Sequence, residues 1–108
     1  MAGATLPTTF LKPITMNRTI IKADGTTANY SPRSGGHYEL DELQSIVGGY
    51  IQIISLHDGR LMVINDEGKL LALPMNSLAT DIALEQGAIF ANDFIVGDVL
   101  ICREGDIL

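Results

Sequence analysis

The side chains most often used as nucleophiles, bases or metal ligands are sparse here and far apart: His37, His57 and Cys102. The histidines are not paired at helical spacing, and neither lies near the cysteine, so no metal-ligand pattern exists. Cys102 follows an apolar run that predicts a buried strand, and burial keeps a thiol protonated and inert. No serine lies in the G-x-S-x-G pattern of hydrolases. We therefore expect no catalytic residue, no metal and no cofactor, and a protein that is not an enzyme.

Two glycine-containing stretches invite comparison with ligand-binding loops. Gly35 and Gly36 precede a predicted helix, as in a phosphate cradle, but the acidic residues Glu39, Asp41 and Glu42 at its start would repel phosphate. The stretch INDEGK has the oxygen donors of a calcium loop but not its twelve-residue spacing or closing glutamate. The first stretch is interpreted as a loop and the second as a hairpin turn.

Length and composition place the chain among ordinary small domains. It has 108 residues, enough for one domain, and a single cysteine, which excludes an internal disulfide and fits a reducing compartment. The first residues lack the basic and apolar regions of a signal peptide. No apolar stretch approaches the ~20 residues that span a bilayer. We expect a cytoplasmic protein without a membrane partner.

The charge of the chain argues against a nucleic-acid partner. The net charge is −6, with +3 over residues 1–38 and −9 over residues 39–108. Nucleic-acid binding requires a basic face, and the acidic part offers none. The acids are scattered, mostly in turns, and are interpreted as solubilising charge.

The first half of the chain predicts a hairpin and a helix. Asp24-Gly25 separates two short β-rich runs and favours a tight hairpin turn. Leu40, Leu43 and Val47 then recur at helical spacing, and Gly48 is suited to the left-handed conformation that ends a helix.

The stretch from Tyr50 to Pro74 predicts a three-stranded antiparallel meander. Asp58-Gly59 and Glu67-Gly68 separate three apolar runs of strand length. Pro74 cannot donate to a sheet ladder and should end the third strand.

The last third of the chain predicts a second helix and a terminal strand. Asn76 is a favoured N-cap for a helix that runs to about Glu85 and is closed by Gly87. Residues 94–102 are β-rich around Gly97-Asp98. We favour one strand with a bulge there over a hairpin of two very short strands.

Together these elements predict a single α+β domain over residues 17–108, preceded by an N-terminal arm at residues 1–16. Its mainly antiparallel sheet would contain the N-terminal hairpin, the central meander and the C-terminal strand, with two short helices against a face. A ferredoxin-like arrangement is the alternative topology.

The ordered combination of several of these stretches resembles a known family. The features are the helix end Val47–Tyr50, the turn Asn65–Lys69, the step Leu73–Asn76 and the late stretch Ile95–Asp98. They resemble the small proteins of domain of unknown function 3846, carried largely by bacteriophages, plasmids and other bacterial mobile elements. The resemblance covers roughly residues 18–102. It implies a bacterial or phage accessory protein and brings no established activity.

The leading hypothesis is a non-enzymatic module that binds a host or element-encoded protein. It predicts an exposed apolar patch or an open sheet edge. The alternative is a small-molecule or nucleotide-binding protein with a pocket near Gly48-Gly49 and the Asn76 step, to which Asp98 would also contribute. An unrecognised enzyme is the remaining alternative. The sequence leaves the oligomeric state open.

Overall fold

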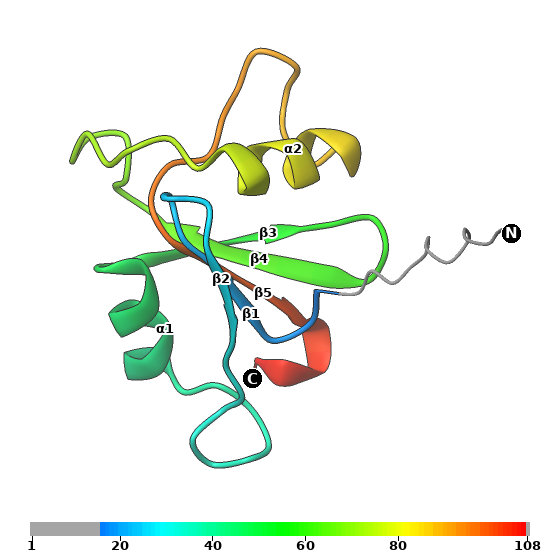
Figure 1. Ribbon diagram of the computed structural model, residues 1–108. Coiled ribbons are helices and arrows are strands. Elements are labelled where there is room, and N and C mark those ends of the chain that lie inside the picture. Colours follow the sequence, from blue (N-terminus) through cyan, green and yellow to red (C-terminus); the bar gives the residue numbers. More distant parts are fainter. Residues whose placement is uncertain (1–15, 108) are drawn as a thin grey trace, which may run out of the picture.

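The computed structural model describes residues 16–107, so the predicted arm lies outside the described residues except for Met16. The strands are β1 (Thr19–Ile21), β2 (Thr27–Asn29), β3 (Ile51–Ser55), β4 (Arg60–Asn65) and β5 (Val99–Arg103). The helices are α1 (Leu40–Val47) and α2 (Ser77–Glu85), and a short 3-10 turn, η2 (Glu104–Asp106), follows β5 (Figure 1).

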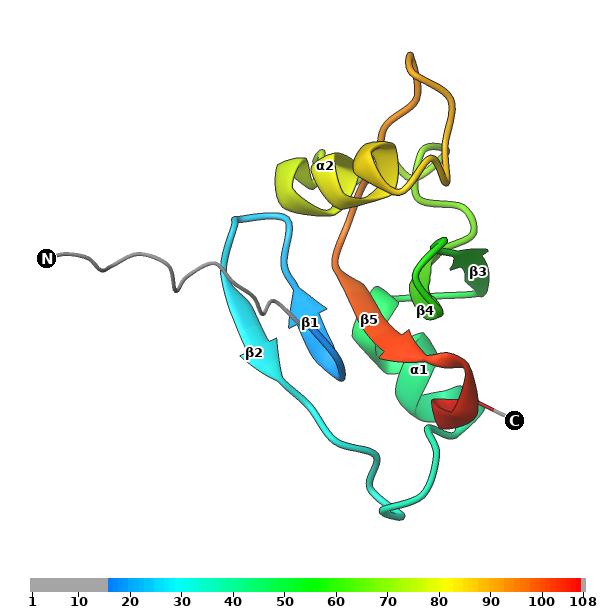
Figure 2. The ribbon, with the colours of Figure 1, turned by 90° about the vertical axis from the view of Figure 1, so that its right-hand side faces the viewer.

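The five strands form one antiparallel sheet in the order β2-β1-β5-β4-β3. Figure 2 shows them side by side, with the C-terminal strand in the middle. Strand β5 thus joins the β1–β2 hairpin to the β3–β4 hairpin. The predicted α+β class and the antiparallel sheet are confirmed.

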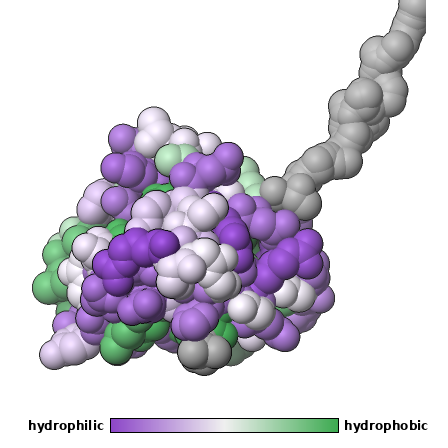
Figure 3. Space-filling model, turned by 90° about the horizontal axis from the view of Figure 1, so that it is seen from below, coloured by the Kyte–Doolittle hydropathy of each residue, from purple (hydrophilic) through white to green (hydrophobic). Residues whose placement is uncertain are grey.

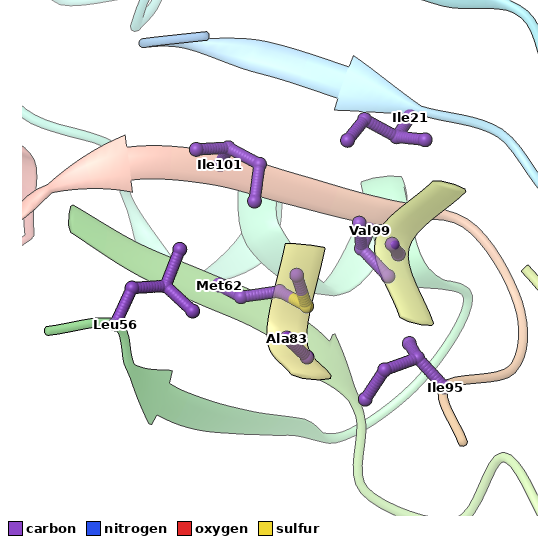
Figure 4. Packing of buried hydrophobic residues seen from close by; sticks show 8 residues of the cluster. Ile21, Leu56, Met62, Ala83, Ile95, Val99 and Ile101 are labelled. Carbon is purple, nitrogen blue, oxygen red and sulfur yellow. The ribbon is translucent and has the colours of Figure 1, made fainter. Parts of the chain in front are cut away.

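The helices lie on opposite faces of this sheet, not on one face as the sequence predicted (Figure 1). Successive residues of a strand point to opposite faces. Met62 accordingly packs with Ala79 and Ala83 of α2, in a cluster that also contains Ile21, Leu56, Ile95, Val99 and Ile101 (Figure 4). Its neighbours Leu61 and Val63 pack with Leu43 and Val47 of α1. Both faces are covered, which also excludes the ferredoxin-like arrangement.

The third strand of the predicted meander is not formed. After β4 the backbone closes on itself: Gly68 N donates to Asn65 O, Leu71 N to Glu67 O and Ala72 N to Lys69 O. Leu70 is 85% exposed, as expected of a turn. Strand β4 already has β3 and β5 as neighbours, so the sheet has no position for a local third strand beside it.

The bulged strand predicted over residues 94–102 is also wrong. Only Val99–Arg103 joins the sheet. The residues before it pair with the segment that leads into α2: Asn76 N donates to Ile95 O and Gly97 N donates to Pro74 O, both at 2.8 Å. This contact joins segments some twenty residues apart, and for that reason no local pattern indicated it.

The turn at Glu67-Gly68 is not the predicted hairpin turn, because the next element of the chain is α2 and not a strand. Three other local predictions are confirmed. The β1–β2 hairpin turns at Gly25, α1 ends at Gly48 and α2 begins after Asn76. Within residues 16–107, no helix is long and apolar enough to cross a membrane.

Candidate functional site

Asn76 connects three parts of the fold and is wholly buried. Its side-chain oxygen accepts the Ala79 N–H at 3.1 Å, which is the predicted helix cap. Its Nδ2 donates to Ile21 O at 3.0 Å and to Gly97 O at 2.9 Å. Each hydrogen of the amide thus has an acceptor within the fold. This arrangement supports a structural role.

Gly48 and Gly49 end α1 and bring the chain into β3. Gly48 has a φ of +83°, which favours glycine. A Cβ on Gly49 would lie 3.0 Å from Asn65 Nδ2, the atom that donates to Val47 O. The two glycines therefore allow the helix end to approach β4 closely.

Asp98 is half-buried and accepts the Ala23 N–H at 2.9 Å, which anchors the turn of the β1–β2 hairpin. It lies next to Gly97, a partner of Asn76, so these two predicted site residues are neighbours. Gly48 and Gly49 instead contact Asn65 at the end of β4. None of the four lines either of the pockets described below, and their binding role stays a prediction.

The other reactive side chains are dispersed or buried. Burial, followed by the nearby Asp106 carboxylate, raises the pKa of the Cys102 thiol to about 12. The His57 ring packs against Gly87. Among residues 16–107, no three His, Cys, Asp or Glu side chains are grouped so that they could hold a metal ion.

The most elaborate polar network surrounds the buried carboxylate of Glu42. It accepts the Glu39 N–H at 3.0 Å, the Arg33 N–H at 2.9 Å and the Tyr30 hydroxyl at 2.9 Å. The backbone bond from Glu39, above all, lowers the pKa of this carboxyl, and those from Arg33 and Tyr30 add to it. The network ties the loop after β2 to the start of α1. A carboxylate with all these donors is structural.

The outer edge of β3 has unused hydrogen-bonding capacity. The ladder bonds Asp66 N to Tyr50 O and Leu56 N to Arg60 O, so even-numbered residues bond to β4. The N–H and C=O groups of Ile51, Ile53 and Ser55 point away from the sheet. Within residues 16–107, none of them has a hydrogen-bond partner.

Among residues 16–107, this edge has none of the usual protection against strand pairing. Strand β3 is five residues long and carries no charge, proline or bulge. The opposite edge, β2, has three residues. Natural proteins commonly shorten or charge a strand edge that must stay unpaired. The β3 edge is therefore the longer of the two open edges of this sheet.

A pocket borders β3 on the α1 face of the sheet. It has a volume of about 390 Å³ and lies between the start of α1, Ile107 and the strand. Leu40 is 59% exposed and Ile53 42% exposed, and Leu43 and Ile51 extend the apolar lining. Figure 3, viewed from the α1 side, shows a mainly hydrophilic surface with apolar areas at its margins.

A second pocket, of about 410 Å³, borders β3 on the α2 face. Gln52, Ile54 and Ile64 form its floor, and the turn after β4 and the loop over residues 87–96 form its walls. That loop rises above the β4 and β3 side of the sheet (Figure 2). Lys69 forms an ion pair with Asp93 that joins the two walls, and its Nζ lies 4.5 Å from the centre of the Phe94 ring.

Sequence reasoning missed this edge as a site, although it named an open sheet edge as the mark of an interaction module. The available signal was the uncharged run Tyr50–Leu56. Whether such a run lies at an edge depends on where β5 inserts, and that is set by contacts between distant residues.

Fold and surface define a small α+β domain whose antiparallel sheet carries one helix on each face and has its longer open edge at β3. A family model described as domain of unknown function (DUF3846) matches residues 16–107. The chain belongs to this family. No curated protein and no solved structure matches it significantly.

Proposed function

We propose that this protein is a non-enzymatic interaction module that binds an extended segment of another protein as a sixth strand beside β3. One observation carries the proposal. The β3 edge offers three outward-facing residues with unpaired backbone groups, and a pocket borders it on each face of the sheet. In strand addition, main-chain hydrogen bonds supply affinity and flanking pockets supply specificity.

The backbone geometry suits an added strand. Ile51, Ile53 and Ser55 each present one donor and one acceptor along the same line. A partner segment of five or six residues would engage all of them. Each net hydrogen bond is worth only about 1 kcal/mol, so the side chains of the segment must supply part of the affinity.

A second copy of this chain is a poorer occupant. Two β3 strands pairing about Ile53 would bring the Asp66 and Glu67 end of one edge to the Asp58 end of the other. Asp58 is neutralised by Arg60 at 2.7 Å, so the repulsion comes from the net charge of −6 that each molecule carries. The favoured occupant is therefore a segment of a different protein.

The resemblance noted in the sequence supplies a biological setting for this proposal. Proteins of this kind are expected in bacteria, phages or plasmids, as cytoplasmic accessory proteins. The partner would be encoded by the host or by the mobile element itself.

A peptide selection tests the proposal. A displayed library of random heptapeptides is selected against the folded protein, and the enriched peptides are measured against Ile53→Pro and Thr27→Pro. Proline at residue 53 removes an outward N–H and leaves the bonds to β4 in place. Thr27 also presents an outward N–H, but on the β2 edge, so Thr27→Pro is the matched control.

Binding that is lost in Ile53→Pro and retained in Thr27→Pro supports strand addition at β3. Peptides that bind both variants equally would contradict it, as would a selection that enriches nothing. Circular dichroism and urea unfolding establish that both variants are folded. If the purified protein pairs through β3 with a second copy, sedimentation will show dimers that Ile53→Pro dissociates, and the proposed occupant is then wrong.

A further inference from the structure

The two pockets beside β3 differ in chemistry, and this difference constrains the segment that the edge can bind. This constraint rests on the proposed strand addition. Residues directly opposite each other in a sheet share a face. Side chains opposite Ile51, Ile53 and Ser55 would therefore face the α1 side, and those opposite Gln52 and Ile54 would face the α2 side.

The α1 side is suited to aliphatic side chains. Leu40, Leu43, Ile53 and Ile107 line it, and the partly exposed Leu40 and Ile53 would be covered by an added strand. The only carboxylate among the lining residues is Glu39, which lies 3.8 Å from Arg33. The residues that line this pocket therefore include no unpaired carboxylate that would call for a cationic partner.

The α2 side is suited to a long cationic side chain. Its lining contains three charged residues, and two of them, Lys69 and Asp93, neutralise each other. The third, Asp66, is exposed, and its carboxylate has no hydrogen bond or ion pair with any residue of the described part of the chain. Ile54 and Ile64 form an apolar floor beside it.

The distance between Asp66 and an added strand determines which cationic side chains could reach its carboxylate. Asp66 continues β4, so an added strand would lie two strand spacings away, roughly 9.5 Å at 4.7–4.9 Å each. Only Lys or Arg bridges that separation. Asp66 lies opposite Tyr50 and two residues beyond Ile64, the partner of Gln52, so a Lys or Arg opposite Gln52 is the side chain within reach. Its aliphatic stem would cross Gln52 beside Ile64 while the charged head reaches Asp66, as these amphipathic side chains do on other apolar surfaces.

We infer that the β3 edge recognises an extended segment in which aliphatic residues alternate with Lys or Arg. Aliphatic side chains occupy the α1-side pocket, and the basic side chain opposite Gln52 crosses the α2-side pocket to Asp66.

Synthetic peptides test this inference. The probe is acetyl-Thr-Val-Lys-Val-Lys-Val-Thr-amide with a fluorophore, and binding is followed by anisotropy at low salt. A second peptide carries Glu in place of both Lys. A third, Thr-Val-Val-Val-Lys-Lys-Thr, has the composition of the probe without the alternation. Each is titrated into wild type, Asp66→Asn and Glu67→Gln.

The Glu67→Gln variant is the matched control because Glu67 is the neighbouring acid, is exposed and does not line the pocket. Both substitutions remove one negative charge, so general attraction to an acidic protein changes equally. We expect Asp66→Asn to weaken the probe about threefold, the scale of one solvent-accessible ion pair, and Glu67→Gln to leave it within error. We also expect the probe to bind more tightly than the peptides with Glu or without the alternation.

Equal effects of the two substitutions would overturn the inference, and so would equal binding of the alternating and non-alternating peptides. The strand-addition proposal fails in a different way. If strand addition itself is wrong, Ile53→Pro will bind the probe as tightly as wild type does, whichever of the three peptides the protein prefers.

Discussion

Single residues show how far local chemistry predicts a role. Asn76 was predicted as a helix cap from its position after Pro74, and the Ala79 N–H confirms it. Its two other hydrogen bonds reach Ile21 and Gly97, which are 55 and 21 residues away. A helix cap can be predicted from the sequence because its partner lies in the next turn of the chain. A contact with a residue far away in the chain produces no pattern in the neighbouring sequence, so it cannot be predicted in this way.

Replacing Asn76 with Ala should therefore cost more than a lost cap. The cap contributes about 1 kcal/mol, and the two carbonyls left without the amide donor add roughly 1–2 kcal/mol or more. We expect the free energy of unfolding to fall by about 3 kcal/mol, measured by urea denaturation. The exposed first residue of the same helix provides the control, Ser77→Ala, which should change it by under about 0.5 kcal/mol. A loss of only 1 kcal/mol in Asn76→Ala would mean that the two long-range bonds contribute nothing.

The buried carboxylate of Glu42 should make the fold sensitive to acid. Its folded-state pKa lies below the ordinary value of 4.5, mainly because it accepts the Glu39 N–H. A group with a depressed folded pKa stabilises the fold above its unfolded pKa, and this stabilisation is lost as the pH falls through the folded value. We expect stability to decline below about pH 4.5 and Glu42→Gln to decline less steeply. Parallel slopes for the two proteins, measured by urea unfolding from pH 3 to 7, would contradict this role.

For helices and strands, sequence patterns confined to a turn or a helix end predicted the structure correctly. Patterns typical of a strand did not, because a strand also needs a partner strand beside it. The Gly25 turn and the Gly48 helix end need only their own backbone conformations. The run Lys69–Leu73 is as apolar as a strand, but β5 occupies the position beside β4. The backbone groups of that run are bonded locally instead.

The end of α1 offers a test of this local account. Gly48 has a φ of +83° and open space around the position of a Cβ. Gly48→Ala should therefore destabilise the protein by backbone strain alone, by about 1 kcal/mol in thermal or urea unfolding. Gly36 also has open space but no positive φ, so Gly36→Ala is the control and should be nearly neutral. Equal costs at the two positions would contradict the conformational explanation.

For the whole molecule, the class of fold was predictable and its layering was not. The sequences of both helices show an apolar stripe, but such a stripe does not indicate which face of the sheet the helix covers. The face is set by the direction in which the chain leaves Gly49 and Asn76, and this depends on Asn65, Ile21 and Gly97. The insertion of β5 between β1 and β4 leaves β3 at an edge, and for this reason the candidate site could not be located from sequence.

The buried centre of the sheet can be monitored through Cys102. Its thiol is inaccessible in β5 and its pKa is raised to about 12, so it should not react in the folded protein. We expect labelling by a thiol reagent at pH 8 to be slow and to accelerate with urea in parallel with the loss of ellipticity. Rapid stoichiometric labelling without denaturant would contradict the placement of β5 at the centre of the sheet.

Amide hydrogen exchange by NMR, with and without a selected peptide, tests strand addition at β3 most directly. In the free protein, Gln52 and Ile54 should be protected by β4, and Ile51, Ile53 and Ser55 should exchange quickly. On binding, we expect these three odd-numbered amides to gain protection while the amides of the β2 edge do not. A peptide that binds tightly yet leaves all three exchanging at their free rates would contradict it.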